Sequence, residues 1–142
     1  MANPLAFPAL HASHAGIWIA MPDGETRLVG KAEAVARAAE TPMVMLNAPL
    51  VAQRLGYPDL SGLDLLELYA FIYPARFAVP TPKGLAKTLN LPAPATDQEV
   101  PLFLLRAAHN LLSVLGDPAW AEREGAWDSA QALMRLRWPW AN

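Results

Sequence analysis

The chain has 142 residues, enough for one domain with a sizeable core; 54% of them are hydrophobic and 17% are charged. The formal net charge of −2 provides no long-range attraction for nucleic acid. Because there is no cysteine, disulfides, thiolate nucleophiles and thiolate metal sites are excluded. No signal peptide and no membrane-spanning apolar run can be recognised, so we expect a cytoplasmic protein. The apolar excess indicates that part of the surface meets another domain or subunit.

The first thirty residues predict an arm followed by a hairpin. Residues 1–15 contain early prolines and no clear period, which favours a lead-in arm. Residues 15–20 form a short β-prone run, and residues 26–29 resume it. The intervening Pro22-Asp-Gly24 has the residue types of a turn.

A helix, a buried strand and a second helix are predicted next. Residues 31–40 are alanine-rich and end at Thr41-Pro42, which stops a helix. The unbroken apolar run of residues 43–46 is typical of a strand buried on both faces. A short helix then begins around Pro49 and ends at Gly56.

The rest of the chain is mostly helical by pattern. Ser61 and Asp64 have the spacing of a capping box and predict a helix that ends at Tyr73-Pro74. Another short helix is expected over residues 81–89. After a proline-containing linker, Thr96 and Glu99 form a second capping-box pattern. It opens a long helix over residues 100–115, and a final helical region follows.

These elements predict an α/β fold in which a small mixed sheet is covered by helices and the C-terminal half is helical. We expect one domain over residues 1–142. It would comprise the arm of residues 1–15, a core over residues 16–116 and a C-terminal helical extension over residues 117–142.

The common catalytic and nucleotide-binding motifs are missing. The eight glycines do not cluster into a phosphate loop, and no Walker lysine pattern is present. No serine lies in a Gly-x-Ser-x-Gly elbow.

The histidines and acids allow only weak hypotheses. His11 and His14 could share a metal, but a polar surface arm explains them better. His109 is better explained as a boundary histidine than as a catalytic one, because no acid or nucleophile is placed to orient it. Asp64 and Glu67 suit the start of a helix, where the dipole favours negative charge; a catalytic pair is the alternative.

An aromatic and basic cluster lies near the C-terminus. Basic residues among aromatics could stack on bases and hold phosphates, or the cluster could pack on a following domain or on the core. The cluster consists of Trp127, Arg135, Arg137, Trp138 and Trp140.

Several long strings together resemble the N-terminal region of alphaproteobacterial ATP-dependent DNA helicases of the DinG/XPD-like class. The resemblance spans nearly the whole chain. It implies a helicase motor C-terminal to Asn142, with ATP and Mg²⁺ needed only by that motor. The strings are residues 41–58 (TPMVMLNAPLVAQRLGYP), 61–68 (SGLDLLEL), 74–86 (PARFAVPTPKGLA), 122–127 (EREGAW) and 136–140 (LRWPW).

A second resemblance is to exonuclease domains of the DnaQ type (DEDD, RNase H-like), which precede the motor in several such helicases. These domains carry Asp-x-Glu on the first strand, a His-Asn-Ala-x-Phe-Asp-like string after a buried strand, a helix written Asp-x-Leu-Glu-Leu and a late His-x-x-x-x-Asp. Residues 46–51 (LNAPLV), which include Asn47, resemble the second string. Asp64 and the residues after it resemble the helix.

The family's catalytic residues do not carry over. Leu46 occupies the position of the His of the second string, and Val51 occupies the position of its metal-binding Asp. The strand expected over residues 17–20 has no acid; Asp23 and Glu25 have the right spacing but lie in the predicted turn. Two-metal cleavage needs several carboxylates around the ions. The resemblance therefore implies a degenerate RNase H-like domain that cannot cut and binds no metal or other cofactor.

The leading hypothesis is a non-catalytic accessory domain of a DNA helicase, involved in DNA repair, that packs on the motor or assists DNA engagement. One alternative is a residual metal-dependent 3′–5′ exonuclease that uses Asp23, Glu25 and Asp64. The other is a stand-alone nucleic-acid or protein binding module. The expected partners are the motor and, in addition, DNA; no membrane is expected.

Overall fold

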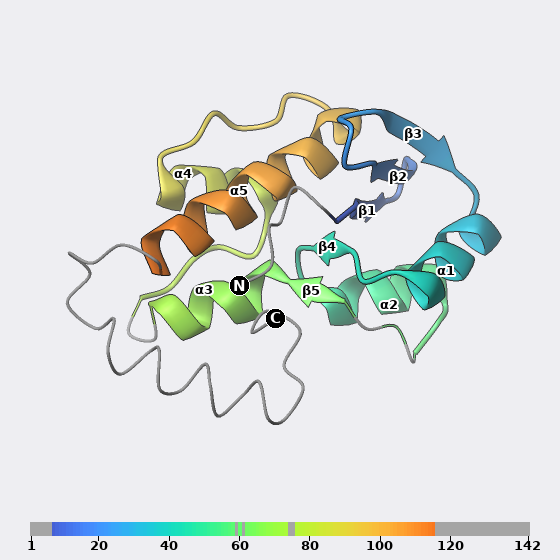
Figure 1. Ribbon diagram of the computed structural model, residues 1–142, viewed down its shortest axis with the longest axis horizontal. Coiled ribbons are helices and arrows are strands. Elements are labelled where there is room, and N and C mark those ends of the chain that lie inside the picture. Colours follow the sequence, from blue (N-terminus) through green and yellow to red (C-terminus); the bar gives the residue numbers. More distant parts are fainter. Residues whose placement is uncertain (1–6, 59, 61, 74–75, 116–142) are drawn as a thin grey trace.

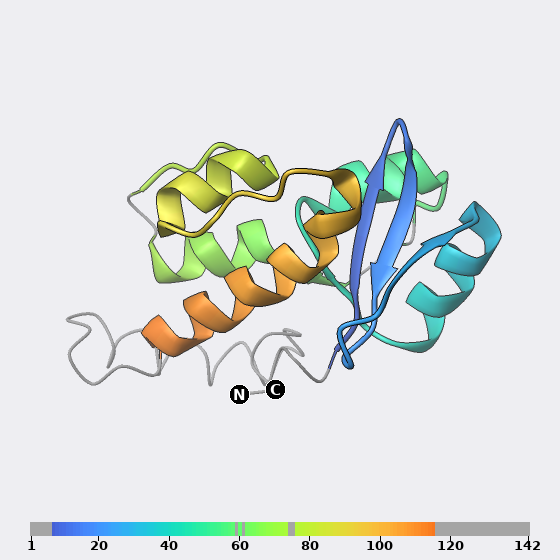
Figure 2. The same cartoon turned by 90° about the horizontal axis from the view of Figure 1, so that it is seen from above.

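The structure is a computed structural model, and it describes residues 7–58, 60, 62–73 and 76–115. In this part of the chain, a five-stranded mixed sheet has helices on both faces (Figures 1 and 2). The strand order is β3-β2-β1-β4-β5; the β1–β2 and β2–β3 pairs are antiparallel, and the β1–β4 and β4–β5 pairs are parallel. The strands are β1 (Ala9–Ser13), β2 (Gly16–Ala20), β3 (Thr26–Val29), β4 (Val44–Met45) and β5 (Leu63–Asp64). The predicted α/β fold with a small mixed sheet covered by helices is confirmed.

The helices divide between the two faces of the sheet. Helices α1 and α2 lie on one face, and α5 crosses the other, with α3 and α4 packed against α5 (Figure 2). A short 3₁₀ turn, η2 (Asp97–Glu99), leads directly into α5 and lies near β3. The helices are α1 (Lys31–Glu40), α2 (Ala48–Leu55), α3 (Leu65–Ile72), α4 (Pro82–Leu89) and α5 (Val100–Leu115).

The core consists of two apolar clusters separated by the sheet. Alternate residues of a strand point to opposite faces, so Val44 joins the cluster of α3, α4 and α5 while Met43 and Met45 join the cluster of α1 and α2. All three side chains are fully buried. This explains the unbroken apolar run over residues 43–46: a strand covered on both faces has no solvent side.

The lead-in arm predicted for residues 1–15 is wrong over β1, which lies in the middle of the sheet. Leu10 and Ala12 are buried against α1 and α2, whereas His11 and Ser13 point to the other face. This is the alternation of a strand, obscured in sequence by small residues and nearby prolines. The predicted core boundary at residue 16 is therefore too late, while residues 117–142 lie outside the described part.

Most other element predictions are confirmed. The hairpin β2–β3 turns where Gly24 N–H donates to Met21 O at 2.9 Å. Helix α1 has the predicted bounds. Gly56 ends α2 and Asn90 ends α4, both in the left-handed conformation.

Two capping predictions need correction. The helix expected from Ser61 begins only at Leu65, because Leu63 and Asp64 form the strand β5 and pair with β4. Ser61 itself lies outside the described residues. Asp64 is the N-cap residue, and its carboxylate accepts from Leu66 N–H. At the start of η2, Thr96 makes no side-chain cap, and the carboxylate of Glu99 accepts from Ala95 N–H at 2.7 Å.

No described helix has both the length and the apolar character needed to cross a membrane.

Candidate functional site

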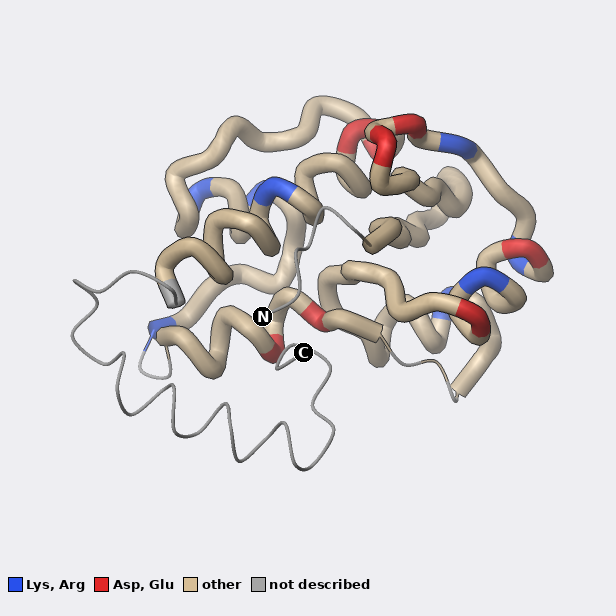
Figure 3. Tube along the Cα trace, viewed as in Figure 1, with Lys and Arg blue, Asp and Glu red and all other residues tan. Residues whose placement is uncertain are grey.

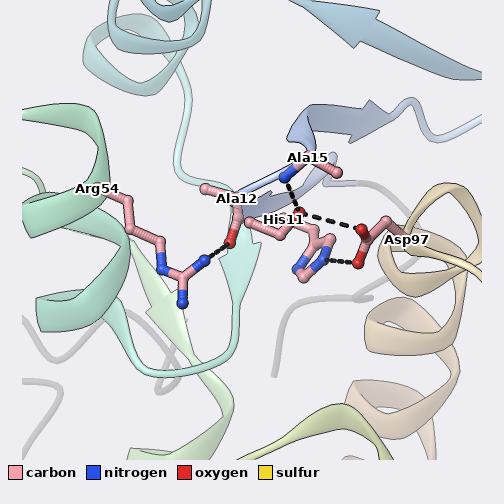
Figure 4. A network of polar contacts seen from close by, with 6 residues as sticks. His11, Ala12, Ala15, Arg54 and Asp97 are labelled. Atoms are coloured by element: carbon pink, nitrogen blue, oxygen red, sulfur yellow. Dashed lines mark hydrogen bonds and ion pairs between the residues drawn. The ribbon is translucent and has the colours of Figure 1, made fainter.

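The most prominent polar cluster of the described chain joins the end of β1 to the start of η2 (Figure 4). His11 Nε2 lies 3.0 Å from Asp97 Oδ1, and Ser13 Oγ donates to Asp97 Oδ2 at 3.1 Å. His11 and Ser13 are two residues apart on a strand, so their side chains project from the same face. Residues more than eighty positions apart in sequence thus meet at one carboxylate.

The hydrogen bond from His11 is the main influence on the ionisation of Asp97. It lowers the pKa of the Asp97 carboxyl. Burial, the next largest influence, raises this pKa, and the bond from Ser13 and the charges of His11 and Arg54 lower it further. Asp97 is therefore a carboxylate at neutral pH. With both oxygens bonded, it is held in one position.

Trp18 supports the imidazole from the neighbouring strand. Trp18 is the cross-strand partner of His11, and the two rings stack at 6.2 Å between centroids with an interplanar angle of 24°. The stack and the Asp97 hydrogen bond together restrain the orientation of His11.

Two cavities lie on either side of His11, and both include Pro82 in their walls. The first, of about 180 Å³, lies between the end of β1, the first half of α2 and the segment before α4. Its lining is largely apolar, with Leu46, Leu50 and Val51 among its residues, and Arg54 is its charged member. The second, of about 450 Å³, lies between the start of α4 and residues 94–97, and it is lined by Lys83 and Asp97 among others. Of the described residues lining the two cavities, Asp97 alone is acidic.

Arg54 reaches across from the last turn of α2 to the end of β1. Its Nη1 donates to the backbone oxygen of Ala12 at 3.3 Å, so the guanidinium lies beside the strand, on the other side of His11 from Asp97 (Figure 4). Arg54 also lines the first cavity, and a guanidinium has four N–H donors besides the one that bonds Ala12.

The positions singled out by the exonuclease likeness fall in two places. Leu46 and Val51 line the first cavity, where Val51 is also part of the core under α2. Asn47 is the N-cap of α2; its side chain accepts from Leu50 N–H at 3.4 Å. Asp64 lies under the start of α2 and α3 and lines neither cavity.

Asp64 is buried, and its carboxylate accepts backbone hydrogen bonds at the starts of α2 and α3. It is 8% exposed, and its Oδ1 accepts from Asn47 N–H and Leu66 N–H, both at 3.0 Å. Its Oδ2 accepts from Ala48 N–H at 2.8 Å. One carboxylate therefore caps the start of two helices.

The remaining candidate acids and histidines are not gathered into a site. Asp23 and Glu25 are exposed in the β2–β3 turn, where Asp23 Oδ1 accepts from Glu25 N–H. His14 and His109 are exposed, as is Glu67. Within the described ranges, no three His, Cys, Asp or Glu side chains are placed to hold a metal ion. Asp23, Glu25 and Asp64 therefore do not form the metal site of the residual-nuclease alternative.

The Trp and Arg cluster near the C-terminus stays a prediction, because Trp127, Arg135, Arg137, Trp138 and Trp140 lie outside the described residues. In the described part, acidic positions gather beside the start of α5, and basic positions are dispersed over several helices (Figure 3).

Sequence reasoning missed the cluster around His11. The available signal was the alternation of Leu10, His11, Ala12 and Ser13, which marks a strand with one polar face. Nothing in the sequence indicates that Asp97 meets this face, because the contact depends on how α5 crosses the sheet. No family model, no curated protein and no solved structure matches the chain.

Proposed function

We propose that this chain is a degenerate exonuclease-like domain of the DnaQ type that does not cut nucleic acid. It would serve as the N-terminal accessory domain of an ATP-dependent DNA helicase of the DinG/XPD-like class, packing on the motor or assisting DNA engagement. The helicase part rests on the resemblance of the long sequence strings.

One observation carries the exonuclease part. In the resembled domains the acids come from the first strand and from the segment after a buried strand. Here the first strand is β1, and it ends with His11-Ala-Ser13, in which no residue is acidic. Val51, in the segment after β4, lines the same cavity as His11 and Ser13. Of these positions, Val51 is matched by likeness of sequence, and His11 and Ser13 are matched through their place on the first strand, which the sequence likeness predicts at residues 17–20.

The same arrangement supports the absence of cleavage. The end of the first strand and the segment after β4 contribute His11, Ser13 and Val51, none of them acidic, and Asp97 is the one acid among the described residues lining the two cavities. Two-metal phosphodiester cleavage requires several carboxylates around ions about 4 Å apart. A lone carboxylate already bonded to His11 and Ser13 does not meet that requirement.

Cleavage is tested directly by incubating the protein with end-labelled single-stranded DNA and either Mg²⁺ or Mn²⁺. We expect no shortened product. Metal-dependent shortening that disappears in Asp97→Ala would contradict the proposal, whereas shortening that persists in that variant would indicate a contaminating nuclease.

The helicase part is tested by reading the coding sequence beyond Asn142. We expect a Gly-x-x-x-x-Gly-Lys-Thr motif within the next few hundred codons. If it is present, deleting residues 1–115 from the full polypeptide is expected to reduce DNA unwinding while leaving ATP hydrolysis by the motor measurable. An open reading frame without that motif would contradict this part.

A further inference from the structure

We propose that the two cavities flanking His11 form one metal-independent site for a phosphate-type oxyanion, held by Arg54 and Lys83. This inference rests on the charges and geometry of the cavities and does not require the exonuclease likeness.

The first step is the charge balance of the site. Arg54 lines the first cavity and Lys83 the second, and Asp97 is the one acid among the described residues of the two linings. That carboxylate is already bonded through both oxygens to His11 and Ser13. Leaving His11 aside, the two cations exceed the one carboxylate by one positive charge, so the site favours an anion.

The second step concerns the guanidinium of Arg54. Its Nη1 donates to Ala12 O, and a guanidinium has further N–H donors available beside the cavity that Arg54 lines. A guanidinium presents paired donors that match two oxygens of a phosphate group, and such charge-assisted bonds are the strong ones. Its bond to the strand holds the fork in place before a ligand arrives, which reduces the entropy cost of binding.

The third step is the shape of the lining. Beside Arg54, the first cavity is lined by Leu46, Leu50 and Val51, which can contact the apolar part of a phosphorylated molecule. The second cavity opens on the far side of His11 with Lys83 at its wall. The phosphate can come from a small phosphorylated compound or from the backbone of a DNA strand.

The test is a titration of the ¹⁵N-labelled protein with inorganic phosphate at low ionic strength, followed by amide chemical shifts. We expect saturable shifts at residues 11–13, around Arg54 and at residues 81–83. Arg54→Gln should weaken the affinity about tenfold or more, and Lys83→Gln several-fold. Arg106→Gln and Lys87→Gln are matched controls, because both side chains are exposed on α5 and α4 and line neither cavity; they should leave the affinity unchanged.

A second arm distinguishes the source of the phosphate. A short oligothymidylate that shifts the same amides at lower concentration than inorganic phosphate identifies a DNA backbone as the ligand, and no effect of the oligonucleotide identifies a small phosphorylated compound. Either result supports the site.

Shifts that rise linearly without saturation, or that are the same in Arg54→Gln as in Arg106→Gln, would overturn the proposal. Thermal unfolding of each variant shows whether it folds. If Arg54→Gln does not fold, Arg54→Lys replaces it, because this variant keeps the charge and loses the paired donors. Its affinity for phosphate should be lower than that of the wild type. An unchanged affinity would count against the site.

Discussion

At the scale of single residues, Asp97 links the protonation of a side chain to the stability of the fold. Its carboxylate ties β1 to η2 through His11 and Ser13. The hydrogen bond from His11 lowers the pKa of Asp97 in the folded protein. The ionised form is therefore favoured by folding, and its contribution to stability is present above the unfolded-state pKa of about 3.9.

This contribution should be lost as the pH falls through the lower, folded-state pKa of Asp97. At neutral pH we expect Asp97→Asn to lower the free energy of unfolding by up to about 1 kcal/mol, a small value because the Asp97 side chain is 40% exposed. The difference between the variant and the wild type should shrink as the pH falls below the ordinary pKa of an aspartate and should vanish once Asp97 is protonated in both states. Urea unfolding at a series of pH values measures it, with the exposed Glu25→Gln as control. A difference that stays constant over this range would show that Asp97 acts through packing alone.

At the scale of helices and strands, Asp64 shows how one side chain can fix three elements. It ends β5, is the N-cap of α3 and accepts backbone N–H bonds from the first turn of α2. An amide at this position would place an NH₂ group against a backbone N–H donor and leave that donor unsatisfied.

We therefore expect Asp64→Asn to lower the free energy of unfolding by about 2 to 3 kcal/mol. Asp23→Asn is a matched control, because Asp23 also accepts a backbone N–H bond but is exposed in a turn; its effect should stay within about 0.5 kcal/mol. Chemical denaturation of the two variants gives both values. Equal effects would mean that the cap at Asp64 adds nothing beyond that of a surface turn.

The elements that the sequence predicts well are those with local signals. Helix α4 has Thr81 as its N-cap and Asn90 in the left-handed conformation at its end, and both could be recognised from residue type. Strand β1 could not, because all of its five residues except Leu10 are small or polar and its stability comes from neighbours on both sides in the sheet. The sequence pattern predicts a helix start where β5 lies, because the two residues of β5 pair only with a strand nineteen positions earlier.

At the scale of the whole molecule, the same distinction explains the candidate site. Leu46, Asn47, Val51 and Asp64 were found by likeness of sequence strings, and two of them line a cavity. The polar cluster of His11, Ser13 and Asp97 depends on tertiary structure, since α5 must cross the sheet for Asp97 to reach β1. Local patterns do not contain that information.

The strand β4 lies between the two apolar clusters and should make them unfold together. Val44 packs with α3, α4 and α5, and Met45 packs with α1 and α2, although the two residues are adjacent and fully buried. Removing either side chain leaves a cavity, for which we expect a loss of about 2 to 4 kcal/mol. Because both residues belong to one strand that is covered on both faces, the loss should be transmitted to the opposite face.

Amide hydrogen exchange tests this coupling. In Met45→Ala we expect the slowest-exchanging amides of α5, on the far face, to lose as much protection as those of α1. In Val44→Ala we expect the slowest amides of α1 to lose as much protection as those of α5. Global unfolding exposes both faces at once. Val79→Ala is the control, since Val79 is 49% exposed and should change neither set. If Met45→Ala accelerated exchange in α1 and α2 alone, the two faces of the sheet would be separate cooperative units, and the cluster of His11 and Asp97 on the α5 side could then change its stability without affecting α1.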